Sequence, residues 1–226
     1  MLRVLVCVLS VGRLFAGATA PTLSPSFAPS AAPSSARSSQ YSIKLFAGTG
    51  AFSSTGNGGQ ATAATFFTLR TVWFDTAGVA YLVESGAMCV RTVDTSGIVH
   101  SFAGVCGTPG SSGDGGAASS ALFSYCPTIF VSTVGNQYIP DLSNNKVRMV
   151  STSGIISAVI GTGTAATSGD GGKATAAAIN APHSVWGNSV GSLYIGSYED
   201  HLVRSMDSSN IIHTLAGMHD FYLLSL

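Results

Sequence analysis

The sequence predicts an all-β protein built from three copies of one four-stranded unit, and three observations support this prediction. A glycine-rich stretch occurs three times, as Gly56–Gly59, Gly113–Gly116 and Gly169–Gly172. The residues after it repeat at constant distances without a gap, so that the period is 57 and then 56 residues. Each repeat also contains four short runs rich in Val, Ile, Tyr, Phe and Trp, which are typical of strands.

The repeated positions hold glycine, aromatic residues and arginine. They are Gly59, Gly116 and Gly172; Trp73, Phe130 and Trp186; Gly78, Gly135 and Gly191; Tyr81, Tyr138 and Tyr194; and Arg91, Arg148 and Arg204. We interpret the glycines and arginines as structural positions that define the repeat. An aromatic residue at a first-strand position favours the core between neighbouring units over a sugar-stacking surface.

In the first repeat the four runs are Thr71–Phe74, Val79–Glu84, Met88–Val93 and Ile98–Ala103. Turn residues separate them, which predicts an antiparallel meander. Such a sheet cannot bury both faces alone, and radial stacking of such units gives a β-propeller, which has about four to eight blades. A β-sandwich and a β-solenoid are the alternatives, but a sandwich has no reason to repeat so strictly and a solenoid rung is usually shorter.

The turn before the last strand of each unit holds Gly97, Gly154 or Asn210. Asn is the residue other than glycine that best tolerates a positive φ. The exchange of Gly for Asn therefore predicts a left-handed backbone at this turn position.

With these residues in view, the sequence resembles a known family, the NHL-repeat β-propellers, in the subclass with long repeats. The resemblance rests on Ala47–Gly50, Ser112–Gly116, Tyr138–Asp141, Ser143–Arg148 and Ser153–Ile156, and it extends from residue 43 to about residue 218. It implies the propeller fold and leaves the activity open, because propellers host many functions. Some relatives with this fold are lyases or hydrolases with a metal in the central channel.

The repeats, at about 48–103, 104–160 and 161–217, provide three blades, which are too few to close a ring. A further, isolated strand is predicted at Ile43–Ala47, because this segment matches the last strand of a meander. The third repeat already has its own last strand, so Ile43–Ala47 has no blade to complete. We expect an incomplete, open propeller, either as a fragment of a longer protein or as one of two copies that close a ring together, and the fragment is favoured.

Composition excludes some partners. Charged residues make up 9% of the 226 residues, against roughly 25% in an ordinary soluble domain. Ten basic and ten acidic side chains cancel. Nucleic-acid binding depends on clustered Lys and Arg, so no nucleic-acid partner is expected. No basic amphipathic stretch indicates a membrane surface.

Residues 1–20 have the features of a secretory signal peptide, with an apolar run at Val4–Gly12 and an A-x-A cleavage site at Ala18–Ala20. The run is far shorter than the roughly 20 residues that a membrane span needs, so no span is expected after signal removal. Residues 21–40 are rich in Pro, Ser and Ala, which predicts an extended linker. We expect a secreted, extracellular or cell-wall protein in which residues 41–226 form the propeller.

Signal removal would take Cys7 and leave Cys89, Cys106 and Cys126, an odd number. Cys106 and Cys126 flank the second glycine-rich loop, and in a secreted chain a disulfide between them would close it. Cys89 would then be free or intermolecular. Sequence separation alone does not show whether the Cα atoms approach closely enough.

Asn57, Asp114 and Asp170 recur on the connectors between units. Hard cations take about six to eight oxygen ligands, and each loop offers one acid or amide among glycines, so a metal site is not favoured. We interpret these residues as caps of the short Ala-rich turns that follow. The sequence has no zinc-type His spacing, nucleophile motif or phosphate-binding loop. No catalytic residue, metal or cofactor is therefore expected.

The repeated arginines are expected to form ion pairs inside the fold rather than a binding ring. In the first two repeats an acid stands seven residues before the arginine, and a hairpin centred between them would place the two side chains directly opposite. The third repeat has Ser197 at that position, so its arginine needs another partner. The expected pairs are Glu84 with Arg91, Asp141 with Arg148, and either Glu199 or Asp200 with Arg204.

The function expected from these observations is that of a secreted or cell-surface scaffold, not an enzyme, that binds protein or glycan partners through its loop faces. The alternative is a propeller-type lyase or hydrolase whose catalytic blades lie outside this stretch, and inward-facing His and Asp from several blades would distinguish it. The open end leaves strand edges and an apolar sheet face uncovered. Such surfaces promote association, so we expect the chain to be dimeric or aggregated.

Overall fold

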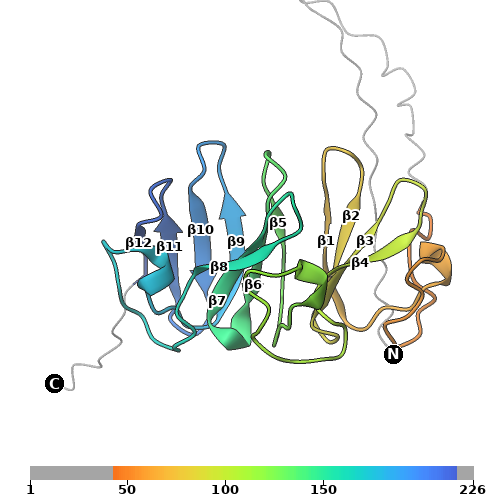
Figure 1. The fold of residues 1–226 in the computed structure, drawn as a ribbon, viewed down its shortest axis with the longest axis horizontal. Helices are drawn as coiled ribbons and strands as arrows, with labels where there is room; N and C mark the ends of the chain where they lie inside the picture. Colours follow the sequence, from red (N-terminus) through yellow and green to blue (C-terminus); the bar gives the residue numbers. More distant parts are fainter. Residues whose placement is uncertain (1–42, 218–226) are drawn as a thin grey trace, which may run out of the picture.

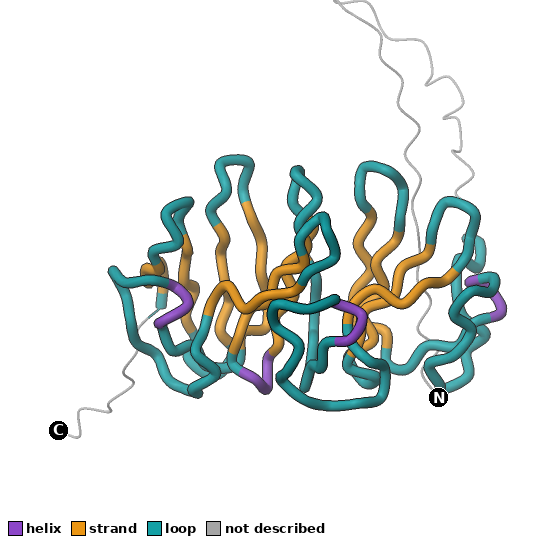
Figure 2. Tube along the Cα trace, in the orientation of Figure 1, coloured by secondary structure: helices purple, strands orange, loops and turns teal. Residues whose placement is uncertain are grey.

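The computed structural model describes residues 43–217, which form three four-stranded antiparallel sheets arranged in an arc (Figures 1 and 2). The predicted signal peptide at 1–20 and the linker at 21–40 lie outside the described residues. The predicted all-β fold of three four-stranded blades is confirmed, and the open arc fits an incomplete propeller. We refer to the sheets as blades 1 to 3 in chain order.

The strands of each blade follow one another along the chain. Blade 1 consists of β1 (Leu69–Phe74), β2 (Ala80–Glu84), β3 (Cys89–Val93) and β4 (Val99–Ala103). Blade 2 consists of β5 (Phe130–Val131), β6 (Gln137–Asp141), β7 (Lys146–Val150) and β8 (Ile156–Ile160). Blade 3 consists of β9 (Pro182–Gly187), β10 (Leu193–Ser197), β11 (Leu202–Met206) and β12 (Ile212–Ala216).

Short 3-10 helices interrupt the connections between strands. They are η1 (Ala61–Ala63), η2 (Ala118–Ser120) and η4 (Ala174–Ala176), each before a blade, and η3 (Leu142–Asn144) after β6. Within residues 43–217, no helix has the length and apolar character needed to cross a bilayer.

The three blades repeat one strand register. The first-strand aromatic residue stands opposite the second-strand tyrosine in every blade: Trp73 opposite Tyr81, Phe130 opposite Tyr138 and Trp186 opposite Tyr194. The pairing of the third and fourth strands shifts immediately before the repeated arginine in all three blades. An irregularity of this kind bends the strand and re-aims the adjacent side chain, which sets the direction of each arginine.

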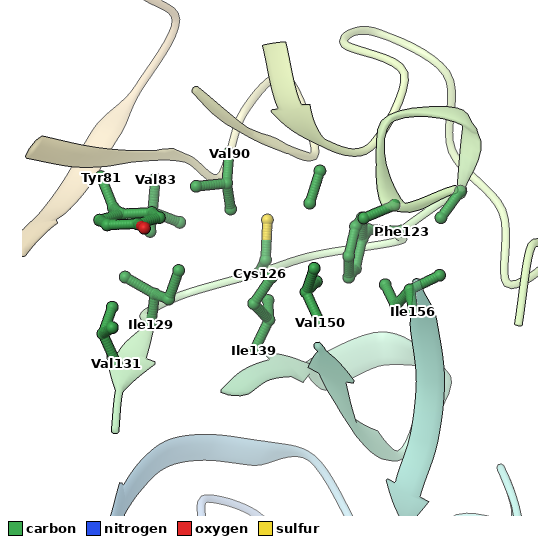
Figure 3. Packing of buried hydrophobic residues seen from close by; sticks show 13 residues of the cluster. Tyr81, Val83, Val90, Phe123, Cys126, Ile129, Val131, Ile139, Val150 and Ile156 are labelled. Carbon is green, nitrogen blue, oxygen red and sulfur yellow. The ribbon is translucent and has the colours of Figure 1, made fainter. Parts of the chain in front are cut away.

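Apolar side chains from adjacent blades pack face to face, so the core lies between the blades. Figure 3 shows Tyr81, Val83 and Val90 of blade 1 facing Ile129 and Ile139 of blade 2. The alternation of inward and outward side chains along each strand therefore serves two interfaces, one on each side of the sheet.

The aromatic residues of the first strands connect all three blades. The ring centroids of Trp73 and Phe130 lie 5.6 Å apart, and those of Phe130 and Trp186 lie 6.0 Å apart. The first pair meets edge to face, which is a favoured geometry for aromatic rings. These contacts support the prediction of a core position for Trp73 and Phe130, whereas Trp186 is 55% exposed.

The left-handed turn positions are confirmed. The φ angle is 80° at Gly97, 79° at Gly154 and 62° at Asn210. Asn210 therefore adopts the conformation that glycine adopts at the same position in the other two repeats.

The predicted strand at Ile43–Ala47 is wrong, because these residues form no ladder. A strand needs a neighbour to pair with, and among the described residues no blade precedes blade 1 to offer its third strand. Its end is nevertheless anchored: the N–H groups of Gly48 and Thr49 donate to the carbonyls of Ala61 (2.8 Å) and Ala64 (3.0 Å).

Candidate functional site

Each blade contains one arginine that is 0% exposed: Arg91 on β3, Arg148 on β7 and Arg204 on β11. A guanidinium buried in this way needs partners for its five N–H groups, since an unpaired buried charge is strongly unfavourable. The connector that precedes each blade supplies these partners.

The same three hydrogen bonds recur in every blade. The Nε group donates to the side-chain oxygen of the glycine-rich loop: Asn57 (2.8 Å), Asp114 (3.0 Å) and Asp170 (3.1 Å). One terminal nitrogen donates to the carbonyl of Thr65 (2.9 Å), Leu122 (2.7 Å) or Ala178 (2.8 Å). The other donates to the carbonyl of Thr55 (2.9 Å), Ser112 (3.0 Å) or Ser168 (3.0 Å). We call this arrangement the arginine node.

The arginine node explains why an acid or amide stands in each glycine-rich loop. The predicted capping role is wrong, because the residues before η1, η2 and η4 are Gln60, Ala117 and Lys173, and none of them caps with its side chain. The loop residue instead receives a hydrogen bond from the arginine. In blade 1 Asn57 fills this position, because an amide oxygen can also accept a hydrogen bond.

The predicted ion pairs of the first two blades form. Glu84 Oε1 lies 3.3 Å from Arg91 Nη1, and Asp141 Oδ2 lies 3.7 Å from Arg148 Nη1. The predicted register is wrong, because Glu84 stands opposite Cys89 rather than opposite Arg91. The tight turn after β2 centres one residue earlier than assumed, which moves the partner of Glu84 by two positions, so acid and arginine lie diagonally on one face.

In blade 3 the predicted partner is also wrong. Arg204 pairs with Asp170 on the preceding connector and not with Glu199 or Asp200. Asp170 is 34 residues away in sequence, and no local pattern indicates it. The threefold spacing between loop residue and arginine is the signal that would have revealed the pair.

Burial controls the protonation of these acids. Burial raises the pKa of Glu84 and of Asp141, although hydrogen bonds and the nearby arginine oppose this shift. Burial would also raise the pKa of Asp170, but hydrogen bonds from Thr214 and Arg204 outweigh it and lower the pKa. Asp170, unlike Glu84 and Asp141, is therefore held in its charged form by its contacts.

The cysteines pair differently from the prediction. The disulfide joins Cys89 and Cys106, whose Cα atoms lie 5.0 Å apart, and Cys126 is free and buried. A backbone hydrogen bond from Gly107 to Ala87 draws the connector against the start of β3. Cys126 instead faces the core between blades 1 and 2 (Figure 3), where burial raises its pKa to about 12.

One group of potential metal ligands lies within residues 43–217: Glu84, Cys89 and Cys106, whose ligand atoms fall within 4.8 Å of one another. Two of these atoms form the disulfide. Glu84 accepts from the N–H of Phe67 (2.8 Å) and contacts Arg91. The disulfide-bonded chain therefore has no free thiolate there for a metal.

Six turns lie together on one side of the arc, because the first and third turns of every meander point the same way (Figure 1). We call them the hairpin rim. They are residues 75–79, 94–98, 132–136, 151–155, 188–192 and 207–211. Each begins with a residue whose side-chain oxygen accepts backbone N–H groups of its own turn: Asp75, Asp94, Ser132, Ser151, Asn188 and Asp207.

The hairpin rim displays few charges. Val134 and Val190 are each 73% exposed at its tips. His100 lies 2.8 Å from Asp94, and the hydrogen bond from this histidine is the main cause that lowers the pKa of Asp94. The sequence signal for these six leading residues is an oxygen-bearing side chain three positions before the left-handed Gly or Asn.

Three stacked meanders, with apolar faces between them and one buried arginine in each, define an open arc of a β-propeller. Comparison with solved structures supports this class. A putative phosphatase from Bacteroides thetaiotaomicron matches with a TM-score of 0.52 and 16% identity, over 70% of this chain and 37% of that one. An auxiliary nutrient binding protein from Bacteroides ovatus matches with a TM-score of 0.50 and 20% identity, over 64% and 37%.

A protein of unknown function from Bacteroides thetaiotaomicron matches with a TM-score of 0.50 and 22% identity, over 57% of this chain and 32% of that one. At such identities the likeness concerns the fold. The chain therefore spans between 32% and 37% of the length of these three structures. No protein-family model and no curated protein matches the sequence.

Proposed function

We propose that this chain is part of an NHL-type β-propeller that acts outside the cell, secreted or at the cell surface, as a non-enzymatic module that binds a protein or glycan through its loops. The hairpin rim is the observation that carries this proposal. Its six turns come from three blades, and side-chain hydrogen bonds hold each of them in one shape. A preorganised surface loses little conformational entropy when a partner binds.

The charged residues inside the blades support a binding role over catalysis. The arginines, Glu84, Asp141 and the loop acids are engaged with one another and with backbone carbonyls. The Cys89–Cys106 disulfide supports an oxidising location, because such bonds persist in extracellular compartments. The predicted leader at 1–20 agrees with this location.

Binding of the full chain to a printed array of polysaccharides, and to intact cell surfaces, tests the proposal. Val190→Asp changes the hairpin rim, and Tyr198→Asp changes an exposed side chain on the opposite, β10–β11 side of the arc. We expect Val190→Asp to abolish binding and Tyr198→Asp to leave it intact, with equal melting temperatures. Loss with Tyr198→Asp alone, or binding to neither probe, would argue against the rim as the binding surface.

A further inference from the structure

Each blade has two apolar faces, and the repeat shows what covers them. We call the face toward the preceding blade the leading face and the face toward the following blade the trailing face. On the trailing faces of blades 1 and 2, Val90 and Val147 are 0% exposed, because the leading face of the next blade covers them. The equivalent Val203 of blade 3 is 39% exposed, since no residue of the described range 43–217 covers it.

The uncovered trailing face of blade 3 is apolar. Beside Val203 it presents Trp186, 55% exposed, and Leu215, 59% exposed. Large exposed apolar side chains that cluster on one face mark an interaction surface. The partner that fits is the leading face of a blade of this repeat, because such a face covers the same positions twice within the chain.

The leading face of blade 1 is covered by a short segment, Ile43–Thr49. The N–H groups of Gly48 and Thr49 donate to Ala61 and Ala64. The end of each fourth strand makes the same two bonds to the blade that follows: Gly104 and Val105 to Ala118 and Ala121, and Gly161 and Thr162 to Ala174 and Ala177. The segment therefore takes the place of the end of a fourth strand from a preceding blade.

This substitute makes few contacts. Ile43 and Leu45 are 63% and 62% exposed, while Phe46 and Ala47 pack only partly against blade 1. Its sequence from Ile43 to Gly48, IKLFAG, has the pattern of Ile212–Gly217, IHTLAG. Ile212–Gly217 includes the last strand of a complete blade, whereas Ile43–Gly48 belongs to no blade of the described residues.

We propose that the trailing face of blade 3 binds the leading face of blade 1 in a second copy, where Ile212–Gly217 of one copy replaces Ile43–Gly48 of the other. The exchange buries Trp186, Val203 and Leu215 and releases a segment whose side chains are already largely exposed, so apolar burial favours it. Because residues 43–217 carry both a leading and a trailing face, two such contacts join two copies in a ring. Two copies with three blades each provide six blades, within the roughly four to eight of propellers.

Sedimentation equilibrium of the full chain is the first test, and a reversible dimer is the expected result. Leu215→Asp places a carboxylate in the interface and should raise the dimer dissociation constant at least about a hundredfold. Tyr198→Asp, in the β10–β11 turn, is the matched control and should leave the constant unchanged. A monomer at every concentration, or a dimer that tolerates Leu215→Asp, overturns the proposal.

Phe46→Ser tests the exchange itself. Phe46 packs against Phe74 with ring centroids 5.6 Å apart, so its loss loosens the substitute segment without touching blade 3. We expect dimerisation to become several-fold tighter. Weaker dimerisation would mean that the segment belongs to the interface and would contradict the replacement.

The two tryptophans of the chain distinguish this head-to-tail contact from a symmetric contact between two trailing faces. First-strand aromatics of adjacent blades lie 5.6 Å and 6.0 Å apart, so Trp186 of one copy should couple with the first-strand Trp73 of the other. We expect an exciton couplet in circular dichroism that grows with dimer formation and disappears in both Trp73→Phe and Trp186→Phe. A couplet that survives Trp73→Phe would indicate the symmetric contact and overturn the proposal.

Discussion

At the scale of single residues, the arginine node is the most demanding feature of the chain. Three guanidinium groups lie fully buried in a protein with few charges, and each is satisfied by one side chain and two carbonyls of a connector. Two of the nodes also contain a fully buried acid, Glu84 or Asp141, while the third has Ser197 at that position. The three nodes therefore differ in what remains when the arginine is removed.

Arg91→Ala and Arg148→Ala should each lower the free energy of unfolding by about 3–5 kcal/mol, because each leaves a buried carboxylate without its cation. Arg204→Ala should cost less, since Asp170, the acid that it leaves, has a side chain that is 45% exposed and can be hydrated. Urea denaturation followed by circular dichroism measures all three. Equal losses would mean that the carbonyl contacts, rather than the acids, dominate the node.

Asp170→Asn should change how stability depends on pH. The pKa of Asp170 is lowered in the fold, so its contribution is present above its ordinary pKa near 4 and is lost as the pH falls through the lowered pKa. At pH 6 the variant should be less stable by no more than about 1 kcal/mol, given the exposure of the side chain. Asn57 shows that Asn fits this position. Urea midpoints of wild type and variant should converge in strong acid, and a difference that is constant with pH would contradict the assignment.

At the scale of elements, the three glycines of the loop at 113–116 differ in how well their positions tolerate a side chain. A Cβ atom at Gly113 would lie 2.6 Å from the Cα of Ala121, and φ there is +101°. At Gly115 φ is +86°, but no atom lies within 4 Å. Gly116 has neither feature, because its nearest contact would be the Gly113 carbonyl at 3.4 Å.

The three alanine substitutions in this loop should therefore destabilise the protein to different degrees. Gly115→Ala should cost about 1–2 kcal/mol, the penalty for a left-handed residue with a side chain. Gly113→Ala should cost more, because the loop must also move away from η2, and Gly116→Ala should cost least. Thermal melting of the three single variants gives the order, and a Gly116→Ala variant as unstable as Gly113→Ala would contradict this explanation.

The positions of the strands could be predicted from the sequence, but some of the pairings between distant residues could not. Four runs of β-forming residues between turn signals located β1 to β4 to within two residues, because the pattern that makes a strand is local. Ile43–Ala47 has the same pattern and forms no strand, because pairing depends on a neighbour that the pattern does not show. The disulfide of Cys89 and the Asp170 partner of Arg204 depend likewise on how a connector lies against a sheet.

At the scale of the whole molecule, stability comes from faces between blades, as in other repeat architectures. Between blades 1 and 2, and between blades 2 and 3, apolar side chains of both sheets pack together and bury one another. The outermost trailing face lacks this cover among residues 43–217. Equivalent side chains therefore contribute unequally along the arc.

Val90→Ala and Val147→Ala should each lower the free energy of unfolding by about 2 kcal/mol, the loss expected for two buried methyl groups and a small cavity. Val203→Ala, at the same repeat position, should cost less than about 0.5 kcal/mol when measured at concentrations where the chain is monomeric. Urea denaturation of the three variants is the measurement. A Val203→Ala loss equal to the others in the monomer would show that another segment covers this face.

The arginine node also bears on how such a chain can lengthen or shorten by duplication. Its acceptors lie 26, 34 and 36 residues before the arginine in every blade, so each polar network closes within one repeat. An in-frame copy of one unit of 56 or 57 residues would bring its own cation and all of its acceptors. At the new junctions the apolar faces and the paired backbone hydrogen bonds would have to match, and there Phe66, Phe123 and Ile179 already occupy one equivalent position. A gene segment of that length is thus a heritable module that can be gained or lost without leaving a buried charge alone.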